Sequence, residues 1–258
     1  DVGKDDPPYT SEWIRTFGSM AGDPAGARNR KWGNAVCRDR KGGESQVGYW
    51  GLELARRLVE SQTVPICVLN GAVGGSRIDQ HQRNASDPED ARTIYGRLLW
   101  RVREAKLTHG IRAVIWHQGE NDQGADGPTG GYGWETYRDY FIDLSAGWKQ
   151  DYPNVQRHYL FQIWPRACSM GVNGSDNALR EVQRTLPRYY SNMGIMSTLG
   201  IKPPGGCHFP LAGYGEFARL LCPLVERDIY GKAFDRPVTP PDLKRAYFTS
   251  GKRDELAL

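Results

Sequence analysis

The densest group of reactive side chains in the sequence lies between residues 117 and 122. It follows the short apolar run A-V-I-W (113–116) and consists of His117, Gln118, Glu120, Asn121 and Asp122. Short apolar runs are typical of buried parallel strands, and catalytic groups collect just past the carboxyl ends of such strands. The pattern therefore predicts the floor of an active site. The alternative is a polar loop between a strand and a helix, with an Asn or Asp as the helix cap.

A glycine-rich turn, N-G-A-V-G-G-S (70–76), follows another apolar run. No Gly-Lys-Ser/Thr comes after it and its spacing is not G-x-G-x-x-G, so nucleotide binding is only weakly supported. Glycines let backbone N–H groups approach a ligand closely. An N–H of Gly74 or Gly75 is thus a candidate for stabilising an oxyanion. A tight turn that needs a positive φ explains the same glycines equally well.

A single histidine, His208, lies in the Gly- and Pro-rich loop G-I-K-P-P-G-G-C-H-F-P (200–210). This loop follows the apolar run at 193–199 and precedes a helical pattern. If the sheet is parallel, His208 lies at the same sheet edge as Glu120. Imidazole titrates near neutral pH, so His208 is a candidate general base. Otherwise it is a surface or packing residue.

Alternating strands and helices are predicted to position these loops. Apolar residues at helical spacing predict helices near 47–58, 95–102, 134–148, 177–186 and 214–225, and apolar runs predict strands at 64–70, 111–116, 158–164 and 193–199. This alternation indicates βαβ units, right-handed crossovers and a parallel sheet. We expect an irregular segment over 1–31, one α/β domain over 32–232, and a linker with the start of a β-rich segment over 233–258.

Composition limits the possible functions. The chain has 258 residues, 39% of them hydrophobic, which suits one substantial core. The net charge of +4 arises from mixed signs along the chain and indicates no polyanionic partner such as nucleic acid. No apolar stretch approaches the roughly 20 residues that span a bilayer. The five cysteines show no C-x-x-C spacing, which argues against structural zinc. Cys168 and Cys207 lie in loops after predicted strands, and these two cysteines could meet.

Three motifs together resemble a known family. H-Q-G-E-N-D (117–122), the G-G-S turn (74–76) and C-H-F-P-L-A-G-Y-G (207–215), taken together, look like the SGNH (GDSL-type) hydrolases, and most like carbohydrate acetylesterases of the sialate-O-acetylesterase kind. The likeness spans roughly residues 32–230. It implies a three-layer α/β/α, flavodoxin-like fold, an O-acetylated carbohydrate substrate, no metal or other cofactor, and an extracellular or periplasmic location.

The resemblance also assigns an oxyanion hole and a base. Such enzymes use a serine nucleophile, a histidine base, and a hole formed by the nucleophile's own N–H, a glycine N–H and an Asn or Gln side chain. Here His208 matches the base and Gly74 or Gly75 matches the glycine. Asn121 matches the usual asparagine, with Gln118 as its rival.

The acid of the triad departs from the family pattern. The family usually places it three residues before the histidine, in D-x-x-H, but that position is Gly205 here, and no Asp or Glu occurs between Glu181 and Glu216. Glu120 is the natural candidate, because a carboxylate at the same sheet edge would orient the imidazole and stabilise the imidazolium. Asp122 is the second choice.

The nucleophile is the larger departure. The family carries it in a G-Q-S or G-D-S turn after a central apolar strand, and no run before residue 60 qualifies as such a strand. The one similar turn is T-F-G-S-M (16–20), with Ser19, but Arg15 and Thr16 make the preceding segment a poor buried strand. We therefore expect the nucleophile strand to lie on polypeptide upstream of this sequence, in the same chain or in a partner.

The leading functional hypothesis is thus a serine-type acetylesterase. A metal-dependent hydrolase is a second hypothesis, with His117, Glu120, Asp122 and His208 as ligands, although H-x-x-E-x-D is not an established ligand spacing. A third is a catalytically incomplete hydrolase-like domain that binds carbohydrate or needs a partner segment for its nucleophile.

Overall fold

The computed structural model describes residues 9–38, 44–123, 133–166, 174–206, 208–243 and 245–257, and its strands form two main sheets. The first has the order β2-β1-β3, formed by β1 (Ile14–Phe17), β2 (Trp32–Asn34) and β3 (Ile66–Cys67). In it β1 is antiparallel to β2 and parallel to β3. The second has the order β4-β5-β6, formed by β4 (Ala113–His117), β5 (Arg157–Phe161) and β6 (Met193–Met196), all parallel.

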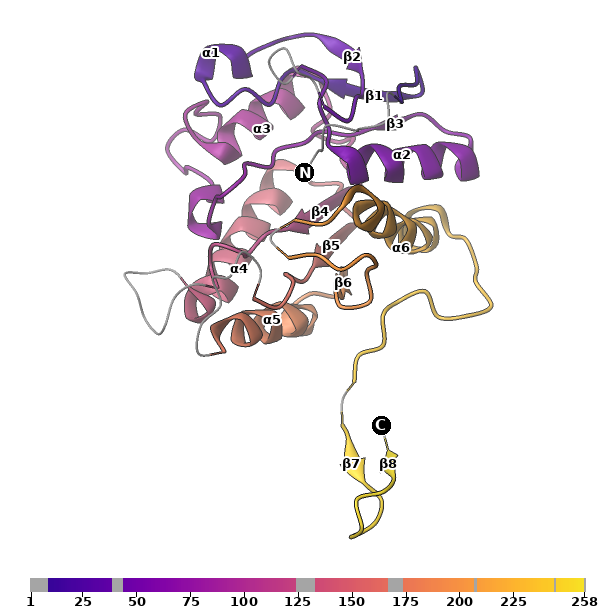
Figure 1. Ribbon diagram of the computed structural model, residues 1–258. Helices are drawn as coiled ribbons and strands as arrows, with labels where there is room; N and C mark the ends of the chain where they lie inside the picture. Colours follow the sequence, from indigo (N-terminus) through magenta and orange to yellow (C-terminus); the bar gives the residue numbers. More distant parts are fainter. Residues whose placement is uncertain are drawn as a thin grey trace.

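Helices cover both faces of these strands (Figure 1). One layer holds α2 (Tyr49–Gln62) and α6 (Leu211–Tyr230), and the other holds α3 (Ile94–Glu104), α4 (Trp134–Asp151) and α5 (Ser175–Thr185). The strand β5 shows the alternation that a sandwiched strand requires. Tyr159 and Phe161 pack into the cluster of α2 and α6, whereas Leu160 packs into that of α3, α4 and α5. The predicted three-layer α/β/α fold is confirmed.

Local signals explain where the helices begin. The helix α3 starts after Thr93, whose hydroxyl accepts a hydrogen bond from the backbone N–H of Gly96 at 2.9 Å, which satisfies one of the free N–H groups of the first turn. The helix α6 follows Pro210 directly. The short elements α1 (Pro24–Ala27), η1 (Ile78–His81) and η3 (Leu186–Arg188) lie in the connections.

Two strand edges in the middle of this arrangement have no partner within the described residues. The strand β3 pairs only with β1, and β4 pairs only with β5. The two edges belong to one layer, because Ile66 of β3 and Ile115 of β4 contact the same apolar cluster below α2 and α6. All five residues of β4 are only partly buried, whereas four of the five in β5 are fully buried. The sheet is therefore interrupted between β3 and β4.

The amino-terminal segment differs from its prediction. Residues 1–31 were expected to be irregular, but β1 lies within them and three of its four residues are buried. Thr16 has no exposed surface although it is polar, and β-branched residues such as threonine favour strands. A prediction based on apolar runs alone missed this strand.

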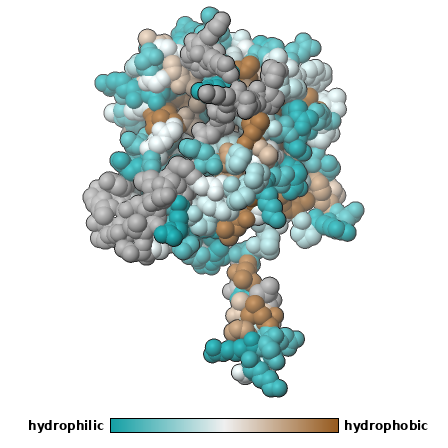
Figure 2. Space-filling view, in the orientation of Figure 1, coloured by the Kyte–Doolittle hydropathy of each residue, from teal (hydrophilic) through white to brown (hydrophobic). Residues whose placement is uncertain are grey.

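The last described residues form a hairpin of β7 (Tyr247–Phe248) and β8 (Leu256–Ala257), which lies apart from the helices and sheets in Figure 1. The turn at Ser250–Gly251 was predicted. Its apolar side chains Phe248 and Leu256 are exposed, and brown, hydrophobic surface is visible on the part of the chain that extends below the body in Figure 2. None of the described helices combines the length and apolar character needed to cross a membrane.

Candidate active site

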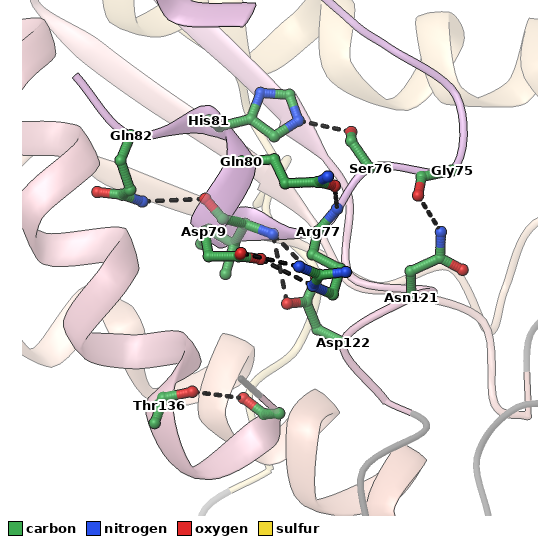
Figure 3. Close-up of polar contacts among 12 residues, drawn as sticks. Gly75, Ser76, Arg77, Asp79, Gln80, His81, Gln82, Asn121, Asp122 and Thr136 are labelled. Atoms are coloured by element: carbon green, nitrogen blue, oxygen red, sulfur yellow. Dashed lines mark hydrogen bonds and ion pairs between the residues drawn. The ribbon is translucent and has the colours of Figure 1, made fainter. Parts of the chain in front are cut away.

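Two loops meet where the sheet is interrupted. One follows β3 and contains Gly75, and the other follows β4 and contains Asn121. The Asn121 side-chain amide donates a hydrogen bond to the carbonyl of Gly75, and the backbone N–H of Ile78 donates to the Asp122 carboxylate at 3.2 and 3.3 Å (Figure 3). The strands β3 and β4 do not pair, yet the loops at their carboxyl ends are joined by side chains.

Gly75 has the backbone conformation that favours glycine. Its φ is +74°, in the left-handed region, and the residue is exposed beside Asn121. A Cβ atom there would lie 3.6 Å from Nδ2 of Asn121, an ordinary contact. The glycine is therefore required by the backbone turn rather than by lack of space.

Gln118 and Asp122 are buried behind this turn. The amide nitrogen of Gln118 donates to the carbonyl of Ser76 at 3.0 Å and to the Asp122 carboxylate. Both N–H groups of Gln118 thus have acceptors inside the protein. Asp122 has no exposed surface, and burial raises its pKa to about 6, although the hydrogen bonds from Gln118 and Ile78 oppose that rise.

A buried serine–histidine pair lies in the same turn, and no motif in the sequence indicated it. Ser76 Oγ is 2.7 Å from the carbonyl of Val73 and 2.7 Å from Nε2 of His81 (Figure 3). A hydroxyl has one hydrogen, and a carbonyl can only accept. Ser76 therefore donates to Val73 and accepts from Nε2–H of His81, so His81 cannot take its proton. Burial also lowers the pKa of His81 to about 4. The pair holds the turn together and is not a nucleophile with its base.

His117 and Glu120 form a second pair at the end of β4. Nε2 of His117 lies 3.5 Å from Oε1 of Glu120. Burial lowers the pKa of His117, the charge of Glu120 partly opposes this, and His208 adds a further lowering. Burial raises the pKa of Tyr214 in α6, a backbone hydrogen bond at Phe209 partly opposes this, and the charge of Glu120 adds a smaller rise. The predicted acid, Glu120, and the predicted base, His208, thus both influence the pKa of His117. Glu120 also influences the pKa of Tyr214 in the first turn of α6.

The position of the family's usual acid is filled by an aromatic ring. A Cβ atom at Gly205 would lie 2.6 Å from Cζ of Phe209, which is buried. Phe209 in turn packs against Trp164 and Phe217. An aspartate at position 205 would collide with this ring, so the D-x-x-H arrangement does not fit here. His208 itself is exposed.

Ser19 follows β1, which is separated by β3 from the unpaired edge where the two loops meet. It is buried after β1, and its Oγ accepts a hydrogen bond from the backbone N–H of Ala21 at 3.0 Å. The strand β1 lies on the far side of β3 from β4.

The suggested metal ligands do not come together. Asp122 is turned toward Ile78 and Gln118, and the searched, described part of the chain contains no group of three or more His, Cys, Asp or Glu that could hold a metal ion. Trp116 packs against Trp148 and Phe141. Cys168 and Cys207 fall outside the described residues.

Helices lie on both faces of the parallel strands, and a glycine turn, an asparagine, a carboxylate and imidazoles lie near their carboxyl edge, as expected for a fold of the SGNH type. The model of the family "Carbohydrate esterase, sialic acid-specific acetylesterase" matches residues 31–194. This is more than half of the chain, and the chain belongs to that family.

A solved structure shares the fold. It is that of a carbohydrate acetylesterase from Xanthomonas citri, with a TM-score of 0.66 and 21% sequence identity. The match covers 93% of this chain and 54% of that one, so this chain spans about half the length of that protein. No match was found among curated proteins.

Proposed function

We propose that this chain forms most of the active site of a serine-type carbohydrate O-acetylesterase. The observation that carries the proposal is the meeting of Gly75 and Asn121 at the interruption of the sheet. Family membership supports the reaction class. The substrate is an acetyl ester on a sugar or polysaccharide, such as acetylated xylan or an O-acetylated sialic acid.

The reaction proceeds in two steps. A serine hydroxyl attacks the acetyl carbonyl while His208 accepts its proton, and the sugar oxygen then leaves with that proton to give an acetyl-enzyme. Water next attacks the acetyl-enzyme, again with His208 as base, and releases acetate. The tetrahedral oxyanion of each step is stabilised by N–H donors placed where its charge develops.

Asn121, rather than Gln118, supplies the side-chain donor of the oxyanion hole. Both N–H groups of Gln118 are engaged by Ser76 and Asp122. Asn121 uses one N–H for the carbonyl of Gly75 and has a second one. The backbone N–H of Gly75 is the glycine donor, and Gly74 precedes it in the same exposed turn.

Glu120, rather than Asp122, supplies the carboxylate of the triad. Asp122 is fully buried and holds Ile78 and Gln118. Glu120 is partly exposed and lies beside His117, whose pKa also responds to His208. A carboxylate at this position can orient the imidazole and stabilise its charged form.

The nucleophile is proposed to come from a strand that pairs with both β3 and β4. Neighbouring strands lie about 4.8 Å apart, so a serine at the carboxyl end of such a strand would lie between the loops of Gly75 and Asn121. Ser19 would lie one strand farther away, beyond β3. The 258 residues contain no G-Q-S or G-D-S turn, which supports a segment outside them as the source of the strand.

The unpaired edges also favour a second candidate function. Without that strand, the chain would bind O-acetylated carbohydrate or a partner polypeptide and would not turn the ester over. A fluorophosphonate probe distinguishes the two functions, because it labels only an activated serine.

The test compares this chain with a longer polypeptide that includes it and its upstream sequence. We expect the longer protein to release acetate from an aryl acetate and from acetylated xylan, and its fluorophosphonate adduct to map outside these 258 residues. His208→Ala should abolish both signals. Full activity in His208→Ala would overturn the esterase proposal, and an adduct on Ser19 would overturn the proposed source of the nucleophile.

A further inference from the structure

His117, the last residue of β4, has a polar atom that no contact within the described residues satisfies. Its Nε2 is buried and forms no hydrogen bond there. The nearest charged group is the carboxylate of Glu120, at 3.5 Å. The imidazole ring lies 5.1 Å from the ring of Phe217 and 6.2 Å from that of Phe161. Aromatic rings thus fix its orientation, and its one polar neighbour on the same loop is Glu120.

A constrained turn brings the two side chains together. Gly119 between them has φ of +138°. A Cβ atom there would lie 3.0 Å from both Ile163 Cγ2 and Gln183 Nε2, so a side chain would crowd both neighbours, and the positive φ would strain it as well. Gln183 also donates to the backbone carbonyl of residue 118 at 3.0 Å. The turn that folds Glu120 back toward His117 is therefore held by α5 and by the end of β5.

We propose that His117 is a positioning residue: in the active protein its buried Nε2–H closes the 3.5 Å separation from the Glu120 carboxylate, donates to it, and holds it where it can orient His208. This rests on the role of Glu120 in the proposed function. The sequence motif alone does not distinguish a positioning role from a packing role. The positioning role is inferred from the distance between the two side chains and from the buried nitrogen that lacks a hydrogen bond.

The surroundings of His117 make it a neutral donor. The titratable groups that act on it within the described residues are Glu120 and His208, and Phe161 and Phe217 pack against it without charge. Burial lowers its pKa, so the ring is uncharged at neutral pH. A lysine or arginine here would cancel the charge of Glu120. A neutral imidazole holds the carboxylate and leaves its negative charge available to stabilise the imidazolium of His208.

Two substitutions separate positioning from packing. His117→Phe keeps an aromatic ring but removes the donor, whereas His117→Gln places an amide N–H close to the position of Nε2. In the active, full-length protein we expect His117→Phe to lower kcat roughly tenfold to a hundredfold, as misplaced catalytic groups do, with little change in KM. The acidic limb of the pH–rate profile should move to lower pH, and His117→Gln should recover most of kcat. Equal losses in both variants, or an unchanged profile in His117→Phe, would overturn the proposal.

A double-mutant cycle tests whether His117 acts through Glu120. If it does, His117→Phe added to Glu120→Gln should reduce kcat little further, because interacting residues are not additive. Fully multiplicative losses would show that the two residues act independently and would contradict the proposal.

One measurement does not depend on activity. ¹⁵N NMR of the histidine rings should show the hydrogen of His117 on Nε2, exchanging slowly with solvent, and its exchange should accelerate in Glu120→Ala. A hydrogen on Nδ1 alone would overturn the positioning role even in an active enzyme. A correct tautomer in a protein that hydrolyses no acetyl ester would instead count against the proposed function.

Discussion

The ring of Phe209 occupies the space that a side chain at position 205 would need, since a Cβ atom there would lie 2.6 Å from its Cζ. This contact explains why a carboxylate three residues before His208 does not fit in this chain. The aromatic cluster around Phe209 and Phe217 replaces that carboxylate with apolar packing.

Restoring the usual acid is therefore expected to damage the protein. Gly205→Asp should lower the free energy of unfolding by about 1 to 3 kcal/mol, the usual cost of overpacking, and should not rescue Glu120→Ala. Denaturant unfolding and acetate release measure the two effects. Gly206→Asp is the matched control, because a Cβ atom at Gly206 has nothing within 4 Å. Rescue of Glu120→Ala by Gly205→Asp would contradict the assignment of Glu120.

Substitutions of Asn121 and Gln118 should have different effects, the first on catalysis and the second on stability. Asn121→Ala should lower kcat by about 10²- to 10³-fold, as the loss of one oxyanion donor does, with little change in the unfolding transition, because Asn121 is only partly buried. Gln118→Ala should lower the unfolding free energy, since its amide bridges Ser76 and Asp122 in the interior. Equal kcat in Asn121→Ala and wild type would move the oxyanion role away from Asn121.

Asp122 should make stability depend on pH between about 4 and 6. Burial raises its pKa from 3.8 to about 6, so the folded state binds this proton more readily than the unfolded chain. Its ionisation therefore costs stability as pH rises through this window, by about 3 kcal/mol at most. Asp122→Asn removes that cost, so the variant should gain stability relative to wild type from pH 4 to pH 7. A difference that is constant with pH would contradict the buried carboxylate.

His81 should have the opposite dependence. Its pKa is lowered by burial from 6.5 to about 4, so below pH 6.5 the unfolded chain takes up a proton that the folded state resists. The contribution of neutral His81 to stability is thus lost as pH falls from 6.5 to 4, by about 3 kcal/mol at most. His81→Gln keeps a hydrogen-bond donor for Ser76. Its free energy of unfolding should fall less steeply than that of wild type as pH is lowered over this range.

Hydrogen exchange can test the open edge of β3 directly. The N–H of Ile66 donates to the carbonyl of Trp13, just before β1, and the N–H of Val68 donates to the carbonyl of Arg15 in β1, both at 2.9 Å. Successive N–H groups of a strand point to opposite sides, so that of Cys67 points to the unpaired edge. In this chain the amide of Cys67 should exchange rapidly and those of Ile66 and Val68 slowly. In the longer protein Cys67 should become protected, and continued rapid exchange there would contradict the inserted strand.

The helices were predictable because their apolar stripes repeat at a fixed period, and α4 and α6 lie where those stripes predicted them. The strand β1 was missed because Arg15 and Thr16 interrupt its apolar run, although Thr16 is fully buried and pairs with Gly33 of β2. The pairing of Ser76 with His81 depends on the exact path of a turn, which neither periodicity nor composition encodes. The interruption of the sheet between β3 and β4 depends on long-range strand pairing, which no local pattern encodes.

The contact between α2 and α6 determines how an incoming strand would be received. Leu54 and Leu58 of α2 share an apolar cluster with Leu221 of α6, and Gln62 donates to Glu226 at 3.0 Å. The helix α2 packs on the half of the sheet that contains β1 and β3, and α6 packs on the half that contains β5. The contact between the two helices therefore holds the two halves together. If a further strand pairs with β3 and β4, it meets helices that already hold their contacts, and the entropic cost of docking would fall mainly on that strand.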